Sequence, residues 1–162
     1  EKTDEKYVEA AKQFYLDCKK EPVVLKKELL GFISNRIQQA VWREMCEIVM
    51  RGACSFEDAD KAVTFGPGLR WGIMGPGLIF RLGAGRDGQG FAHPGMQKSV
   101  NLWLDDMATW TRFPDEWRSE VSAKGMAEEM ANRPAEIGND YDSLAAYRDK
   151  MLVELLKLHG KL

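Results

Sequence analysis

Apolar residues recur at helical spacing along most of this chain, and one short stretch departs from that pattern. Residues 4–20 carry an apolar stripe at i, i+4, i+7, i+8 and i+11, which predicts a first helix with Thr3 as its candidate cap. Pro22 ends this pattern, and the valines after it favour a short strand or an extended linker over 22–26. The helical spacing returns over 31–52 without a proline. We therefore expect one long central helix there, ended by Gly52 in a left-handed conformation.

Shorter helices are predicted for the rest of the chain. Ser55 begins a capping signal for a helix over 56–64, and Gly66-Pro67-Gly68 is a turn by composition. Gly75-Pro76 suits a helix start, because proline is tolerated in the first turn. Further helices are expected over about 76–82, 96–109, 114–130 and 140–158. The predicted fold class is all-α, with six or seven helices and no repeats.

A glycine-rich stretch imitates a nucleotide-binding motif. Gly83, Gly85 and Gly88 satisfy GxGxxG, and Asp105 lies at the distance of the acid that holds a nucleotide ribose. That mechanism needs a strand before the glycines and a helix directly after them, so that a pyrophosphate sits on the helix N-terminus. Neither is predicted here. We therefore interpret residues 83–90 as a mobile loop and expect this chain to bind no dinucleotide by itself.

Composition and charge narrow the class of protein. The chain has 162 residues, of which 44% are apolar and 30% charged, and its formal net charge is −2. This is typical of one soluble domain that buries about 70% of its unfolded surface, and it disfavours a nucleic-acid partner. No apolar run is long enough for a membrane helix, and no signal peptide is recognisable. Because the sequence does not begin with Met, we expect it to be part of a longer chain.

Cysteine and histidine offer little chemistry. Cys18, Cys46 and Cys54 are odd in number and have no CxxC spacing, so neither a disulfide framework nor a metal site is predicted. A reducing, cytoplasmic location is the simpler interpretation. His93 stands beside a proline, where a solvated loop histidine is the better interpretation than a catalytic base, and His159 is close to the end of the sequence.

Six short motifs follow one another between residues 31 and 76. They are Gly31-Phe32-Ile33-Ser34-Asn35-Arg36, Glu44, Gly52, Asp58-Ala59-Asp60, Gly66-Pro67-Gly68-Leu69-Arg70-Trp71 and Met74-Gly75-Pro76. This series resembles the C-terminal domain of the L-3-hydroxyacyl-CoA dehydrogenase family, and within it most closely the carnitine and L-gulonate dehydrogenase branch. The resemblance is clear over 22–82, weaker over 140–158 and not recognisable over 86–135.

The resemblance implies a multi-helix domain like that of 6-phosphogluconate dehydrogenase and 3-hydroxyacyl-CoA dehydrogenase, with one long central helix. In such enzymes an N-terminal Rossmann domain binds NAD and carries the catalytic histidine and glutamate. The helical domain closes the substrate cleft and forms the homodimer. Residues 1–162 would be that helical domain alone, inactive in isolation. The implied reaction oxidises the 3-hydroxyl of a 3-hydroxyacyl-CoA, as in fatty acid metabolism, or of a small 3-hydroxy acid such as carnitine. The alternative is a non-catalytic helical dimerisation module.

Three residues are candidates for the substrate site. Asn35 matches the asparagine of the family's G-F-x-x-N-R motif, which implies a catalytic positioning role on the substrate oxygen; a helix-capping or first-turn hydrogen bond is the structural alternative. Arg70 could hold a substrate carboxylate and Trp71 a quaternary ammonium, the alternative being a packed tryptophan beside a solvated arginine.

Several other residues are predicted to be structural. Arg36 and Glu44 share a helix face and suit a structural or interface role, and Asp105-Asp106 suits an exposed pair with no metal. The remaining tryptophans and most of the methionines are expected in the core and a dimer interface. These are Trp42, Trp103, Trp110, Trp117, Met45, Met50, Met74, Met96 and Met107.

Overall fold

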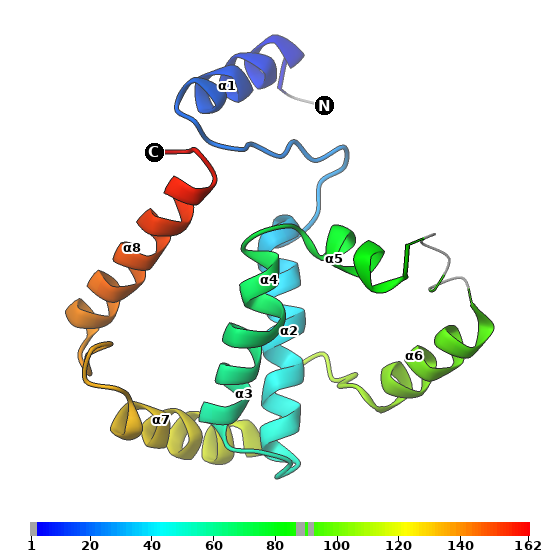
Figure 1. Ribbon diagram of the computed structural model, residues 1–162, viewed down its shortest axis with the longest axis vertical. Coiled ribbons are helices and arrows are strands. Elements are labelled where there is room, and N and C mark those ends of the chain that lie inside the picture. Colours follow the sequence, from blue (N-terminus) through cyan, green and yellow to red (C-terminus); the bar gives the residue numbers. More distant parts are fainter. Residues whose placement is uncertain (1–2, 87–89, 91–92) are drawn as a thin grey trace.

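The computed structural model describes residues 3–86, 90 and 93–162, and this part of the chain is helical without a strand (Figure 1). Seven α-helices have seven or more residues, and an eighth, α4, has three. The predicted all-α class is therefore confirmed. No described helix is both long and apolar enough to cross a membrane.

Helix α1 (Glu5–Asp17) begins one residue later than predicted, and its cap differs from the expected one. The Asp4 carboxylate, and not Thr3, accepts a hydrogen bond from the Lys6 amide at 3.1 Å. A carboxylate is the stronger acceptor for the free amides of a first turn. Residues 22–26 form no strand, so the extended linker is the correct one of the two predicted alternatives.

Helix α2 (Phe32–Met50) is the long central helix that the periodicity predicts. Gly31 precedes it with φ +79°, and Gly52 follows it with φ +69°, both in the left-handed region that favours glycine. The predicted glycine terminator is confirmed.

Helix α3 (Phe56–Val63) starts as predicted, because the Ser55 hydroxyl accepts a hydrogen bond from the Asp58 amide at 3.1 Å. The helical path breaks at Gly66, within the turn that composition predicts for Gly66-Pro67-Gly68. Gly66 has non-helical dihedrals (φ −95°, ψ −112°), and the segment η1 (Thr64–Gly68) joins two helical pieces across this kink before α4 (Leu69–Trp71). Glycine tolerates such dihedrals, and Pro67 has no N–H to donate to the preceding turn.

Helices α5 (Pro76–Gly83) and α6 (Pro94–Asp106) both have proline in the first turn. His93 is the N-cap of α6, and its Nδ1 accepts a hydrogen bond from the Gly95 amide at 3.2 Å. The helix thus begins earlier than predicted and gives this exposed histidine a structural contact. Gly83, the first glycine of the rejected GxGxxG motif, is the last residue of α5, so a helix and no strand leads into the motif. Gly88 lies outside the described residues, and the mobility expected of residues 83–90 stays a prediction.

The C-terminal third contains the π-helical segment η3 (Trp117–Gly125), α7 (Met126–Asn132) and α8 (Tyr141–Leu158). The Asp140 side chain caps α8 by accepting a hydrogen bond from the Ser143 amide at 2.8 Å, and α8 lies within the range 140–158 that the sequence predicts. This contact holds the pKa of the Asp140 carboxyl below its usual range.

The core is small and lies where α2, α3 and η3 meet. Cys46, Phe56 and Val121 form its centre. Gly125 is required there, because a Cβ at this position would stand 2.7 Å from the Phe56 Cβ. Burial raises the pKa of the Cys46 thiol, and all three cysteines are free, as predicted. Partly buried hydrophobic side chains surround the centre: Trp42, Val49, Met50, Trp110 and Trp117.

Much apolar surface lies outside this core. Helices α1, α5, α6 and α8 contain no buried residue, and in Figure 1 α6 and α8 extend away from the central α2–α3 pair on opposite sides. The accessible surface is 13,233 Å². A compact monomer of this mass exposes about 8,200 Å². The chain therefore leaves exposed an area that a packed monomer would cover.

Candidate functional site

Asn35 lies in the first turn of α2 and lines the larger of two hollows beside this helix. The hollow has a volume of about 730 Å³ and lies between α2 and the segment 110–113. The N-cap of α2 is Gly31, and the exposed side-chain amide of Asn35 forms no hydrogen bond with a described residue. The structural alternative for Asn35, a capping or first-turn hydrogen bond, is therefore not formed in the described structure. Its substrate role stays a prediction.

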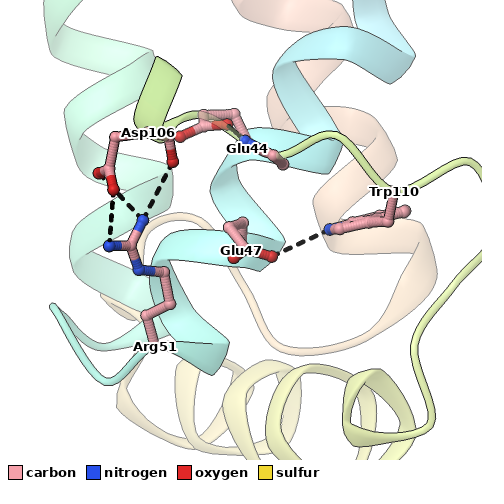
Figure 2. Close-up of polar contacts among 6 residues, drawn as sticks. Glu44, Glu47, Arg51, Asp106 and Trp110 are labelled. Atoms are coloured by element: carbon pink, nitrogen blue, oxygen red, sulfur yellow. Dashed lines mark hydrogen bonds and ion pairs between the residues drawn. The ribbon is translucent and has the colours of Figure 1, made fainter. Parts of the chain in front are cut away.

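Two side chains of α2 and that of Arg51, the residue just after this helix, hold the far wall of this hollow in place (Figure 2). The Glu44 carboxylate accepts the Ala108 amide at 2.8 Å, and Glu47 accepts the Trp110 indole N–H at 3.0 Å. Arg51 donates two hydrogen bonds of 3.0 Å to the Asp106 carboxylate and a third to its backbone oxygen at 3.2 Å. The end of α6 and the chain after it are thereby fixed along α2.

These contacts give the Arg51–Asp106 pair a defined electrostatic state. The guanidinium beside Asp106 holds the pKa of that carboxyl below its usual range, and the carboxylate raises the pKa of Arg51 in turn. Both side chains are exposed, so solvent screens much of their attraction. The predicted exposed acidic pair at 105–106 is thus an ion-paired helix end. Glu44 has the structural role predicted for it, because its carboxylate accepts a hydrogen bond from the backbone amide of Ala108.

Aromatic side chains complete the wall. The rings of Trp110 and Phe113 lie 5.5 Å apart between centroids, and those of Phe113 and Trp117 lie 4.7 Å apart. Arg43 donates from Nη1 to the Trp110 backbone oxygen at 3.3 Å. Segment 110–113 is therefore attached to both α2 and η3.

Positive charge gathers at the hollow. Arg36, Arg43 and Arg112 line it, and its lining contains no carboxylate. Arg36 donates from Nη1 to the Leu30 backbone oxygen at 3.4 Å, a contact that ties the start of α2 to the linker. The hollow therefore presents an amide and three guanidinium groups between aromatic walls.

The structure places Arg70 and Trp71 elsewhere. Trp71 is half-buried and lines a second hollow of about 660 Å³, which shares Ile37, Gln39 and Trp42 with the first and so flanks α2. Arg70 is exposed on α4 and lines neither hollow. Their substrate roles stay predictions, and the structure does not bring Arg70 to Asn35's hollow.

Sequence reasoning missed Arg112 and the wall around it. This segment lies where no family resemblance is recognisable, and Arg112 is distant in sequence from Asn35. The available signal was the run Trp110-Thr111-Arg112-Phe113, in which one arginine stands between two aromatic residues.

The described residues do not fit a metal or a dinucleotide. No group of three or more His, Cys, Asp or Glu residues in the described ranges could hold a metal ion. Gly83 ends a helix, and the described part of the chain has no strand to present a pyrophosphate to a helix N-terminus.

Comparison with known proteins identifies relatives along the whole chain. Residues 31–124 match the family model described as "3-hydroxyacyl-CoA dehydrogenase, C-terminal domain". An L-carnitine dehydrogenase of Bacillus cereus is 30% identical over 98% of this chain and 46% of its own length. A 3-hydroxyacyl-CoA dehydrogenase of Gibberella moniliformis is 35% identical over 99% of this chain and 48% of its own length. An L-carnitine dehydrogenase of Streptomyces coelicolor is 33% identical over 100% of this chain and 48% of its own length. The chain spans about half the length of these relatives.

Proposed function

Since the chain belongs to the 3-hydroxyacyl-CoA dehydrogenase C-terminal domain family, we propose that it is the substrate-closing domain of an NAD-dependent oxidoreductase. The complete protein oxidises the 3-hydroxyl of a 3-hydroxyacyl-CoA or of a small 3-hydroxy acid such as carnitine. The names of the relatives support both substrate classes. The relatives' greater length supports an N-terminal domain in the complete protein.

That N-terminal domain, a Rossmann domain, would hold NAD, because the described residues of this chain do not fit it. NAD supplies the hydride acceptor. The contribution of this chain is to orient the substrate and exclude water. In isolation the 162 residues are therefore expected to be inactive.

The observation that carries the proposal is the position of Asn35 at the hollow beside α2, where its exposed side-chain amide is open to a ligand. An amide donates a hydrogen bond to a substrate oxygen without changing its own charge, so it can hold the 3-hydroxyl and then the carbonyl at one position. The surrounding wall is held by contacts to α2, which keeps the amide and the wall in register.

A homodimer is part of this proposal. The chain exposes about 5,000 Å² more than a compact monomer would. Obligate dimer interfaces bury from about 2,000 to more than 5,000 Å². On α6 alone, Leu102, Trp103 and Leu104 are 62%, 65% and 56% exposed. A second copy and the N-terminal domain would cover such faces. The free cysteines support a reducing, cytoplasmic location.

The test is NAD reduction by the full-length protein. L-Carnitine, 3-hydroxybutyrate and 3-hydroxybutyryl-CoA are offered separately, and NADH is followed by absorbance. Turnover of at least one substrate, lost when the N-terminal half is removed, is the expected result. A folded, dimeric protein that reduces no NAD with any of them would support the alternative, a non-catalytic dimerisation module.

A further inference from the structure

The hollow beside Asn35 concentrates positive charge in a chain whose formal net charge is −2. Arg36 and Arg43 come from α2, and Arg112 comes from the wall segment 110–113. We propose that this site, the arginine hollow, binds the anionic group of the ligand, a carboxylate or a phosphate. The proposal rests on the proposed function, because it assigns the substrate's charged end to the site that contains Asn35.

The three guanidinium groups have most of their donors available. None of them forms an ion pair with a described residue, whereas Arg51 and Arg148 each pair with an aspartate. A guanidinium has five N–H donors. Arg36 and Arg43 each use one on a backbone oxygen, and no described residue hydrogen-bonds Arg112. Their charge is therefore not neutralised within the described structure.

Arg43 is the best fixed of the three arginines. Its Nη1 donates to the Trp110 backbone oxygen at 3.3 Å, and its Nε is buried without a hydrogen-bond partner among the described residues. Because Nε is closed off from solvent, an oxyanion in the hollow would reach this side chain through its Nη atoms.

The nearest acids of the same helix do not compete for these arginines. Glu44 and Glu47 are occupied by the Ala108 amide and the Trp110 indole, and neither lines the hollow. The acids therefore build the wall, while the arginines remain for a ligand.

The aromatic walls do not change this preference for an anion. Trp42, Trp110 and Phe113 line the hollow beside the guanidinium groups, of which those of Arg36 and Arg112 are exposed and that of Arg43 is partly buried. Solvent screens attraction to the two exposed arginines, so the partly buried Arg43 would attract an anion most strongly. An aromatic face can also attract a quaternary ammonium, but three neighbouring guanidinium groups repel one. The hollow thus favours an anion over a cation.

The length of the hollow suits a ligand that also reaches Asn35. Asn35 and Arg36 are adjacent, and Arg43 lies eight residues beyond Asn35, or about 12 Å along the helix axis. A ligand with an oxygen at Asn35 can place its anionic group against Arg36 and Arg112 if it is short, or nearer Arg43 if it is long. A small 3-hydroxy acid and a coenzyme A phosphate represent these two cases.

The experiment compares Arg112→Gln with the unaltered full-length protein. Arg112 is the informative position, because its exposed side chain forms no hydrogen bond or ion pair with a described residue that the fold would lose. Binding is followed without NAD, through the fluorescence of Trp42 and Trp110. The probes are sodium 3-hydroxybutyrate, the uncharged 3-hydroxybutyramide and coenzyme A. Arg112→Gln is expected to raise the Kd of the preferred anionic probe about tenfold or more, to leave the amide unaffected, and to be partly rescued by Arg112→Lys.

Arg118→Gln is the matched control, because Arg118 is exposed on η3 and lies outside both hollows. It should leave all affinities unchanged. Whichever probe responds to Arg112→Gln identifies the anion as a carboxylate or a phosphate. Unchanged affinity for both anions in Arg112→Gln, or a loss in Arg70→Gln instead, would overturn the proposal. Anion binding that depends on Arg112 in a protein that reduces no NAD would support the arginine hollow and count against the proposed function alone.

Discussion

Glu47 accepts the indole N–H of Trp110 at 3.0 Å across 63 positions of sequence. Both side chains are partly buried, and the bond ties the segment after α6 to the central helix (Figure 2). The position of one wall of the arginine hollow therefore depends on the Glu47 carboxylate, together with the contacts of Arg43 and Glu44 on the same helix.

Removing this acceptor should destabilise the protein. Glu47→Ala leaves the Trp110 N–H without its partner, and we expect a loss of about 1–3 kcal/mol in the free energy of unfolding. Glu47→Gln is the control, because its amide oxygen can still accept the bond, and it should lose less. Urea unfolding followed by tryptophan fluorescence measures both. Equal stability of Glu47→Ala and the unaltered protein would show that the bond contributes nothing.

The Arg51–Asp106 pair predicts a pH dependence of stability. Arg51 lowers the pKa of Asp106 in the folded state, so the pair stabilises the protein above the unfolded pKa, about 3.9. That contribution disappears as the pH falls through the lower, folded pKa. Urea midpoints of Asp106→Asn and the unaltered protein should differ at pH 7 and converge below about pH 4, and also in high salt.

Asp105→Asn serves as the control for this series. Asp105 neighbours Asp106 but forms no ion pair with a described residue. Its substitution should shift the midpoint little at either pH. A difference between Asp106→Asn and the unaltered protein that persists at low pH would contradict the assignment.

Asn35→Ala should affect turnover in the full-length enzyme. If the amide holds the substrate oxygen while charge develops on it, its loss should lower kcat about 100-fold or more and leave the affinity for NAD nearly unchanged. Asn101→Ala, an exposed amide on α6 outside both hollows, should retain full activity. Steady-state kinetics test this, and an unaltered kcat in a folded Asn35→Ala protein would discard the role.

The exposed faces predict a dimer that a charge can disrupt. Light scattering should give twice the mass of one chain, which is 18.4 kDa for the 162 residues. Trp103→Glu puts a charge on the exposed apolar face of α6 and should shift the mass toward that of a monomer. Asn101→Glu adds the same charge at an exposed polar position of the same helix and should remain dimeric. A monomeric unaltered protein at high micromolar concentration would refute the dimer.

Local signals predicted most of the helices and several of their ends. Ser55 and Gly52 act as expected, because a cap or a left-handed glycine depends on neighbours within a few residues. The errors arose where two local options compete. Asp4 rather than Thr3 caps α1, and the turn predicted for 66–68 is a kink at Gly66 between two helical pieces. Composition alone does not rank such options.

In the candidate site, too, sequence analysis found the residue that lies in a contiguous motif and missed those that meet only in the folded chain. The family resemblance identified Asn35, whose motif is contiguous, but it did not bring Arg70 to the same hollow or indicate Arg112. The contacts of Glu44, Glu47 and Arg51 with residues 106–110 cross more than fifty positions of sequence, so no local pattern reports them.

By itself the sequence determined that this chain is helical, where its central helix runs and which family it resembles, because helical periodicity, caps and short motifs are local properties of neighbouring residues. Only the tertiary structure decided that the centre of the core lies where α2, α3 and η3 meet and that Arg112 joins Arg36 and Arg43 beside Asn35. That meeting depends on hydrogen bonds and packing between segments far apart in the chain, which form only when the helices come together.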